Sequence, residues 1–276
     1  MSAEPSLWRD LGAVGAILGL FALIGLAPPD SSLSEIRREG VLRACVPSSY
    51  GVLVTPDPDA PGFETEILQA VADRLGVRLA LNLNEAIGRD FNPRAWRLTR
   101  AQCQIIAGGV IASDTTRTFI DTTPPHLETG WVVLAPGAVP ASLRGQKVGV
   151  HVGVSGRDRL ALSQALRTAG AGVVRMDGAG DLADALATGR VGAGVVDAMI
   201  GMELAQVHGL QIAWLQGPEA RDPVAFGLWK GDLTLKRRVV DILDELERDG
   251  TMARLAARYG IRSIEARFAD AGGGGA

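Results

Sequence analysis

Two charged side chains in this sequence, Arg117 and Asp197, could bind a small charged molecule. The guanidinium of arginine is a planar fork that holds a carboxylate through two hydrogen bonds. Asp197 ends the apolar run Gly192–Val196, and a carboxylate buried after a strand is costly without a cationic partner, which the amine of a ligand could supply. Each residue also has a structural interpretation. Arg117 could pair with Asp114 or Asp121 at the surface, and Asp197 could cap the following helix.

The segment around Ser113 predicts the start of a helix. Ser113-Asp114-Thr115-Thr116 is a strong N-cap pattern, because a serine oxygen accepts hydrogen bonds from the first free amides of a helix. The same amides attract anions, so a helix that begins here could turn its N–H groups toward a carboxylate. Ser113 is therefore expected to contact a bound anion, to cap the helix, or to do both.

The sequence lacks the common catalytic and metal-binding patterns. No GxSxG, GxxxxGK[ST] or HExxH occurs, so hydrolase, P-loop and zincin chemistry has no support. The three histidines are isolated from one another and from the cysteines, and we interpret them as structural residues. No cofactor and no metal ion is therefore expected. The histidines are His126, His151 and His208.

The composition is that of a globular protein with a real core. The 276 residues are 47% hydrophobic and 21% charged, and the length suits one large or two modest domains. The net charge of −3 offers no basic stripe, so nucleic-acid binding has no electrostatic support. Cys45 and Cys103 fall in predicted strands and match no zinc pattern. They form either a disulfide, as exported proteins allow, or two small buried apolar residues.

The N-terminal segment is typical of an export signal or a membrane anchor. Leu11–Ala27 is uncharged, and as a helix it would span roughly 25 Å, slightly less than a bilayer core. Gly25-Leu26-Ala27 resembles a cleavage site, but Pro28 directly after it suits a protease poorly. Residues 1–34 are thus expected to be a signal peptide or an N-terminal anchor with a linker. Either way we expect a periplasmic protein, tethered to the inner membrane if residues 11–27 are retained.

Short apolar runs alternate with helical patterns from Glu35 onward. This alternation predicts parallel sheets with helices on both faces. Two extended segments, near Trp131 and Phe226, flank a self-contained block over roughly residues 140–216, which predicts an inserted second domain and a hinge of two crossing strands. The expected strands are Val41–Val46, Val77–Leu83, Cys103–Ala107, Trp131–Ala135, Lys147–Val150, Val173–Val174, Ala193–Val196 and Val224–Trp229. The expected helices are Glu64–Leu75, Gly156–Ala169, Asp181–Thr188, Ala198–Val207, Leu233–Arg248 and Thr251–Tyr259.

Four stretches of the sequence form a recognisable series. They are Gly40–Val46 through Tyr50; Gly62–Ile67, with the pattern G-F-[DE]-x-[DE]-[LI]; Ile105–Gly109 through Ser113, Arg117 and Asp121; and Leu243 through Asp249-Gly250-Thr251 to Leu255, Tyr259 and Gly260. Each motif is weak alone, but their order and spacing together are fairly specific. From about Ile36 to Ile261 the chain resembles the amino-acid-type extracellular solute-binding proteins of bacterial ABC importers, solute-binding family 3.

This resemblance implies an α/β fold of two lobes, the venus-flytrap fold of periplasmic binding proteins, with a two-strand hinge. Each lobe would be a mostly parallel sheet flanked by helices, and ligand would sit between the lobes. Lobe 1 is expected at residues 35–133 and 225–265, and lobe 2 at residues 134–224. The glycine-rich tail, residues 266–276, is expected to be disordered.

The resemblance also implies roles for six residues. Arg117 would bind the α-carboxylate of the ligand, although it lies four residues after Ser113 where the family has three. Asp197 would bind the ligand ammonium, and Tyr50 would stack on the ligand side chain. Gly109, Ser113 and Ser155 would add polar contacts to the ligand. For the two serines, capping of a helix is the alternative role.

Two positions depart from the family pattern near the expected ligand. Gly51-Val52 follows Tyr50 where the family often has Pro-Phe, and Ile111 stands where a serine commonly supports the ligand. These changes leave the pocket more apolar and the identity of the ligand open. Four tryptophans are expected to pack in the core or at the hinge. They are Trp96, Trp131, Trp214 and Trp229.

The expected function is capture of a small polar ligand, an amino acid, by a monomer that delivers it to an ABC permease without catalysis. One alternative is an enzyme like the cyclohexadienyl dehydratases, which share this fold. Another is a membrane-anchored accessory or sensory module, such as those beside periplasmic quinoprotein dehydrogenases, which Cys103 and the stretch Phe91–Arg94 faintly resemble.

Overall fold

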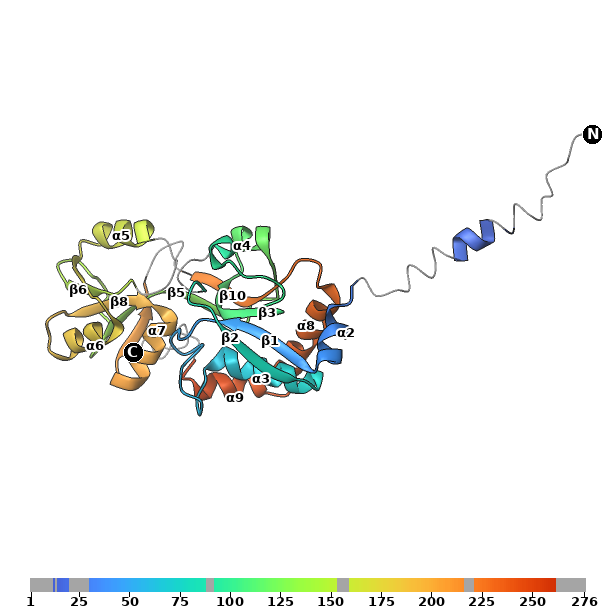
Figure 1. Cartoon of the computed structure of the whole chain (residues 1–276). Coiled ribbons are helices and arrows are strands. Elements are labelled where there is room, and N and C mark those ends of the chain that lie inside the picture. The colour runs from blue at the N-terminus through green and yellow to red at the C-terminus, as the bar shows by residue number, and fades with distance from the viewer. Residues whose placement is uncertain are drawn as a thin grey trace, which may run out of the picture.

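Two α/β lobes lie side by side in the computed structural model, which describes residues 12, 14–19, 30–87, 92–152, 159–215 and 221–261 (Figure 1). The strands are β1 Val41–Val46, β2 Arg78–Leu83, β3 Ile105–Ile111, β4 Asp121–Thr122, β5 Leu127–Ala135, β6 Lys147–Val150, β7 Gly172–Arg175, β8 Ala193–Asp197, β9 Gln211–Trp214 and β10 Arg221–Leu228. The helices are α2 Ser32–Glu39, α3 Phe63–Leu75, η1 Pro93–Trp96 (a 3₁₀ turn), α4 Asp114–Phe119, α5 Arg159–Thr168, α6 Ala179–Ala187, α7 Ala198–His208, α8 Leu233–Arg248 and α9 Thr251–Arg258.

Strands β5 and β10 connect the lobes, as the sequence predicted for the two extended segments. The strand order is β2-β1-β3-β10-β5-β8-β6-β7, with β4 beside β10 and β9 beside β5. Pairs among β1, β2 and β3 in one lobe, and among β6, β7 and β8 in the other, are parallel. The first half of β5 pairs with β10 and its second half pairs with β8 and β9, all antiparallel. One strand therefore belongs to both lobes and forms part of the hinge.

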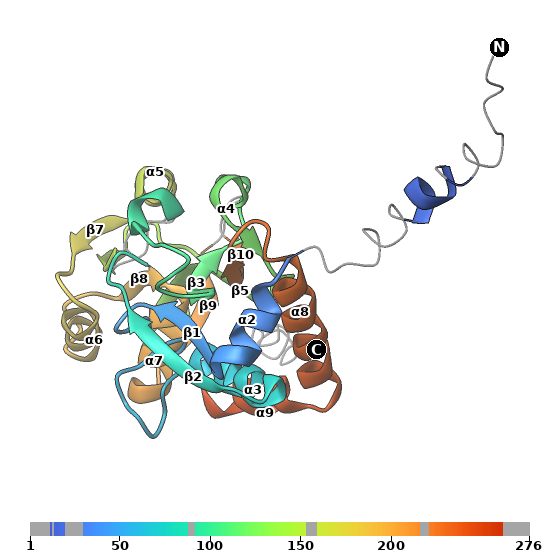
Figure 2. The same cartoon turned by 45° about the vertical axis from the view of Figure 1, so that its right-hand side comes forward.

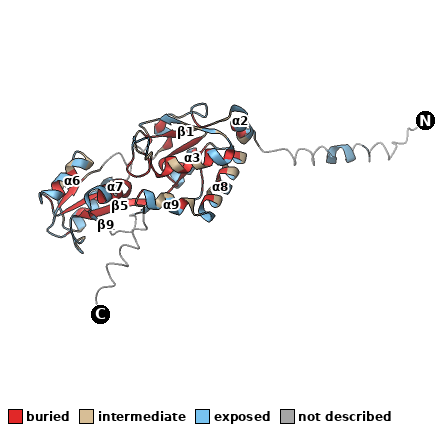
Figure 3. Ribbon diagram, turned by 90° about the horizontal axis from the view of Figure 1, so that it is seen from below, coloured by how far each residue is buried: buried red, intermediate tan, exposed pale blue. Residues whose placement is uncertain are grey.

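The alternation of side chains along these strands builds the cores. In β5, Val132 and Leu134 join the largest buried cluster, whereas Trp131 and Val133 face a second cluster in lobe 2. In β3, Ile105 faces the largest cluster and Ile106 faces a third. A period of two places successive side chains on opposite faces of a sheet, so both faces need helices or loops to cover them. Figure 3 shows the buried strands between helices whose outer faces are exposed.

A disulfide links Cys45 in β1 to Cys103, which lies just before β3. Both cysteines are almost fully buried, in a cluster that also contains Trp96 and Ile106. The pair is therefore a covalent staple between neighbouring segments of lobe 1, one of the two arrangements that the sequence left open. Within the described residues there is no free cysteine.

Helix α2 was not among the expected elements, and it is fixed to lobe 1 by Asp30. The Asp30 carboxylate accepts hydrogen bonds from the Thr234 amide at 2.8 Å and the Thr234 hydroxyl at 2.6 Å, near the start of α8. It also accepts one from the Ser32 amide at 2.8 Å, at the start of α2. One carboxylate thus satisfies free amides at the N-termini of two helices. Figure 2 shows α2 lying beside α8.

Replacing Asp30 by alanine is expected to loosen α2 and to cost about 1–2 kcal/mol of unfolding free energy, because amides of both helices lose their acceptor. Burial raises the pKa of Asp30, but hydrogen bonds from Ser32 and Thr234 outweigh burial and hold it well below the ordinary value of 3.8. The stability that ionised Asp30 contributes is therefore fully present when the pH is above 3.8, and it is lost as the pH falls below 3.8. Hydrogen exchange of α2 in the wild type and in the variant checks this.

The control for this prediction is Asp184→Ala, which removes an exposed carboxylate on α6 and should change neither helix. Unaltered exchange of the α2 amides in Asp30→Ala would contradict the proposed anchoring.

The long periodic elements agree with the sequence prediction. Helix α8 and strand β6 have the predicted bounds, and Gly76 ends α3 in the left-handed conformation at φ 72°. The short elements η1, β4 and β9 were not predicted. The strand expected at Cys103–Ala107 instead spans Ile105–Ile111, because Cys103 and Gln104 lie in the irregular segment before it.

Several predictions fall wholly or partly outside the described residues. Most of the expected anchor, the glycine-rich tail and Ser155 lie there, while Gly12 and Val14–Gly19 are helical. Among the residues that are described, no helix is both long enough and apolar enough to span a bilayer.

Candidate ligand site between the lobes

Tyr50 and Asp197 meet where the two lobes touch. Tyr50 lies in the loop between β1 and α3 of lobe 1, and Asp197 ends β8 of lobe 2. The Tyr50 hydroxyl donates a hydrogen bond of 2.9 Å to Oδ1 of Asp197. Their exposed fractions are 3% and 1%, so the bond is shielded from water. Two residues that were selected from the sequence as ligand contacts, 147 positions apart, are thus brought together.

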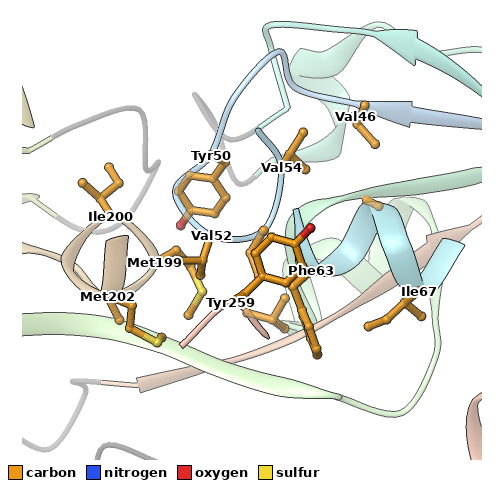
Figure 4. Packing of buried hydrophobic residues seen from close by; sticks show 14 of the residues in the cluster. Val46, Tyr50, Val52, Val54, Phe63, Ile67, Met199, Ile200, Met202 and Tyr259 are labelled. Carbon is orange, nitrogen blue, oxygen red and sulfur yellow. The ribbon is translucent and has the colours of Figure 1, made fainter. Parts of the chain in front are cut away.

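The loop around Tyr50 packs closely on the start of α7. The Val52 amide donates to the Met199 carbonyl at 3.4 Å. Gly51 has a φ of 49°, and a Cβ atom there would lie 2.4 Å from the Met199 carbonyl carbon, so only glycine fits at this approach. Figure 4 shows Tyr50 and Val52 of lobe 1 facing Met199 and Ile200 of lobe 2. The lobes therefore share a buried apolar contact around the polar pair.

Asp197 is the N-cap of α7, the structural role that the sequence left open beside ligand binding. Its Oδ1 accepts a hydrogen bond from the Met199 amide at 2.9 Å, and its Oδ2 accepts one from the Thr129 hydroxyl at 3.1 Å. Thr129 lies in β5, so the same carboxylate contacts the hinge, α7 and the opposite lobe. These donors stabilise the buried negative charge. A ligand ammonium would have to share this carboxylate with them.

Gly109 lies against the ring of Tyr50. It ends the Gly108-Gly109 pair in β3, with φ values of 93° and 83°. A Cβ atom on Gly109 would lie 2.3 Å from Cε1 of Tyr50, so a side chain at this position would displace the ring. Its amide donates to Oε2 of Glu64 at 3.1 Å. In this conformation Gly109 positions the aromatic side chain.

Sequence reasoning missed the buried pair of Glu64 and His126. Glu64 is fully buried at the start of α3, and its Oε2 accepts the Gly108 amide at 2.5 Å as well as that of Gly109. Its Oε1 lies 2.8 Å from Nε2 of His126, which precedes β5 and stacks on Phe226 of β10 with ring centroids 4.5 Å apart. The carboxylate thus joins the Gly108-Gly109 pair of β3, behind Tyr50, to His126, which lies just before β5 and packs on β10.

Ser113 is the N-cap of α4, and its hydroxyl accepts a hydrogen bond from the Thr116 amide at 3.1 Å. The structural alternative for Ser113 is therefore confirmed. Arg117 lies in the last turn of α4 with its side chain 49% exposed, and its guanidinium is 3.8 Å from the Asp114 carboxylate. In the described part of the chain it contacts neither Tyr50 nor Asp197 through a hydrogen bond or an ion pair. Binding of a ligand carboxylate by Arg117 stays a prediction.

The tryptophans and histidines take largely structural positions. Trp96, Trp131 and Trp214 are buried, and the indole of Trp229 donates to the Cys103 carbonyl at 2.6 Å. Nδ1 of His151 lies 3.4 Å from the Met176 carbonyl oxygen. The described residues contain no cluster of His, Cys, Asp or Glu side chains suited to a metal ion.

Replacing Tyr50 by phenylalanine is expected to weaken the closed contact by about 1.5–3 kcal/mol, because a buried carboxylate loses a hydroxyl donor. We expect a larger mean radius of gyration in small-angle X-ray scattering, as more molecules open. Tyr259→Phe is the matched control, since the Tyr259 hydroxyl bonds to Glu66 and to the Gly62 amide within lobe 1. Equal scattering curves for Tyr50→Phe and the wild type would contradict the prediction.

This arrangement defines a class: two α/β lobes joined by two strands, with polar residues of both lobes meeting between them, form a hinged binding protein. The family described as bacterial extracellular solute-binding proteins, family 3, matches residues 43–262. The chain belongs to this family.

Curated relatives are of two kinds. A membrane-bound lytic murein transglycosylase F of Pseudomonas putida is 28% identical over 262 residues, which cover 87% of this chain and 50% of that protein. The chain therefore spans about half the length of the transglycosylases it matches. The L-cystine-binding protein TcyJ of Escherichia coli is 24% identical over 240 residues, covering 82% of this chain and 85% of that protein.

Solved structures share the fold at low sequence identity. An ancestral cationic amino acid solute-binding protein superposes with a TM-score of 0.68 at 20% identity, covering 83% of this chain and 99% of that one. A substrate-binding protein of a Streptococcus pneumoniae ABC uptake transporter, with bound histidine, gives 0.61 at 14% identity, covering 86% and 99%. At this identity the comparison establishes the two-lobed fold alone.

Proposed function

We propose that this protein is a periplasmic solute-binding protein that captures an amino acid between its lobes and delivers it to an ABC permease. The observation that carries the proposal is the buried Tyr50–Asp197 hydrogen bond, which brings two predicted ligand residues together from opposite lobes. A ligand that binds both lobes favours the closed state through contacts that the open state lacks. Relatives described as binding cystine and histidine support the ligand class.

In this proposal the ligand enters beside the existing contacts. Asp197 accepts the ligand ammonium as a further donor, next to the hydroxyls of Tyr50 and Thr129. The exposed Arg117 takes the α-carboxylate, which its fork can bind through two hydrogen bonds once the ligand draws it away from Asp114. Gly109 and Ser113 are proposed to add polar contacts from lobe 1, and Ser155, outside the described residues, is proposed to add one from lobe 2.

A thermal-shift screen of the amino acids, including cystine, tests the proposal. A ligand present at a hundred times its Kd should stabilise the protein by about 2.7 kcal/mol, which raises Tm by about 5–10 °C for a chain of this size. The shift should vanish in Asp197→Ala and in Arg117→Ala, each measured against its own unliganded Tm. A screen without any stabilising amino acid, or a shift that both variants retain, would sink the proposal. Ligand-dependent uptake with the cognate permease then tests delivery.

A second candidate is an accessory binding module that acts beside a membrane enzyme, without transport. It is favoured by the match to one half of several transglycosylases whose names describe them as membrane-bound. The same screen would give a ligand, but cells lacking the protein would take that ligand up normally. Neither candidate includes a catalytic step. Product formation from arogenate or prephenate would instead indicate the dehydratase-like alternative.

A further inference from the structure

A small cavity opens on lobe 1, away from the residues that join the lobes. Its volume is about 200 Å³, and it is bounded by η1 and the loop after it, the end of α4, Ile106 near the start of β3, and Trp229 after β10. None of the five predicted ligand residues that the structure describes lines it. A cavity of about 150 Å³ can hold benzene, so this one accommodates a group about the size of one aromatic ring.

The walls of the cavity are aromatic and already positioned. Trp96 is 3% exposed, and Trp229 is held by the hydrogen bond from its indole to the carbonyl of disulfide-bonded Cys103. Phe119, at the end of α4, is a large apolar side chain that is 38% exposed although it borders the cavity. A group placed between these rings would bury apolar surface without much reordering of the protein.

Two arginines at the cavity lack partners among the residues that the structure describes. Arg94 and Arg97 line it and are exposed, and in the described part of the chain neither guanidinium forms an ion pair or a hydrogen bond. Some other arginines of lobe 1 have acidic partners, such as Arg74 with Asp249 and Arg258 with Glu66. Two free guanidinium groups beside a nonpolar cavity attract an anion and repel a cation.

The backbone conformation of Arg97 is a further feature that is typical of a binding site. Arg97 has a φ of 53°, and among the described residues it is the one non-glycine residue with a positive φ. This conformation is unfavourable for an ordinary side chain, and such strain is often found at binding sites.

We propose that this cavity is a second ligand site, specific for a small carboxylate with an aromatic or apolar body. The body fills the space between Trp96, Phe119 and Trp229, and the carboxylate faces Arg94 and Arg97. The site is independent of the amino-acid site, because it needs no ammonium and involves no residue of lobe 2.

Phenylacetate and its neutral counterpart 2-phenylethanol test the charge requirement. The two probes have the same ring and differ in the carboxylate, so a titration followed by the indole N–H resonances of Trp96 and Trp229 separates charge from apolar contact. We expect a Kd on the order of 1 mM for phenylacetate, as for a fragment-sized ligand. We expect binding of 2-phenylethanol to be at least tenfold weaker. Equal affinities, or indole resonances that do not move, would overturn the proposal.

Variants locate the site. The double variant Arg94→Gln/Arg97→Asn should weaken phenylacetate binding at least tenfold, and asparagine suits residue 97 because it tolerates a positive φ. Arg144→Gln removes an exposed arginine of lobe 2 and should leave the affinity unchanged. Phe119→Ala should weaken both probes. Retained affinity in the double variant would contradict the proposal, as would displacement of phenylacetate by an amino acid that the thermal-shift screen identifies.

Discussion

Replacing Glu64 by leucine is expected to lower the free energy of unfolding by about 3–5 kcal/mol. The fully buried carboxylate accepts the amides of Gly108 and Gly109 and lies 2.8 Å from the imidazole of His126. Leucine leaves both amides and the imidazole buried without an acceptor, and an unpaired buried donor costs about 1–3 kcal/mol. Urea unfolding of the wild type and the variant measures the loss.

The variant Glu64→Gln tests the charge of residue 64 separately from the shape of its side chain. In Glu64→Gln the amide oxygen can still accept the two glycine N–H groups, while its NH₂ group faces Nε2 of His126, which can accept if the other ring nitrogen carries the proton. We therefore expect a smaller loss, about 1–2 kcal/mol. Glu39→Gln, which breaks an exposed pair with Arg43, should change stability by less than about 1 kcal/mol. A loss below about 1 kcal/mol in Glu64→Leu would show that this network does not hold lobe 1 together.

Loss of the Cys45–Cys103 disulfide is expected to cost about 4 kcal/mol, the value that chain entropy gives for a loop closed over 58 residues. The double variant Cys45→Ala/Cys103→Ala should show this loss in urea unfolding without reductant. The wild type with reductant should approach the same value, whereas the variant should not respond to reductant at all. Equal stability of the oxidised wild type and the double variant would contradict the prediction.

The disulfide is also connected to the cavity proposed as a second site. Neither cysteine lines that cavity, but the carbonyl of Cys103 accepts the hydrogen bond that fixes the indole of Trp229, which does line it. The double alanine variant should therefore bind phenylacetate less tightly than the wild type even under conditions where both are fully folded. This readout is separate from global stability.

The sequence was sufficient to predict the class of fold and the long elements. Apolar periodicity defines α8, and the two extended segments near Trp131 and Phe226 are the strands that join the lobes. The capping pattern at Ser113 and the apolar strand before Asp197 each predicted the start of a helix, because these signals depend on neighbouring residues alone.

Contacts that depend on tertiary arrangement were beyond sequence reasoning. The Tyr50–Asp197 bond depends on the relative orientation of the two lobes. The Glu64–His126 pair joins positions 62 residues apart, and His126 follows two prolines in a segment with no apolar periodicity to predict its burial. The disulfide required the alignment of Cys103 beside β1. Acidic Glu64 within an apolar helix start, following Gly62-Phe63, was the one signal that could have indicated a buried carboxylate.

The place where α2 joins the molecule has a mechanical consequence. Asp30 binds the beginnings of α2 and α8, and these helices lie on the side of lobe 1 that is remote from lobe 2 (Figure 1). A force applied through the residues before Asp30 would act on lobe 1 at this point and would not be transmitted through β5 or β10. If the protein were attached at its N-terminal end, lobe 1 would therefore stay fixed while lobe 2 could still move about the hinge.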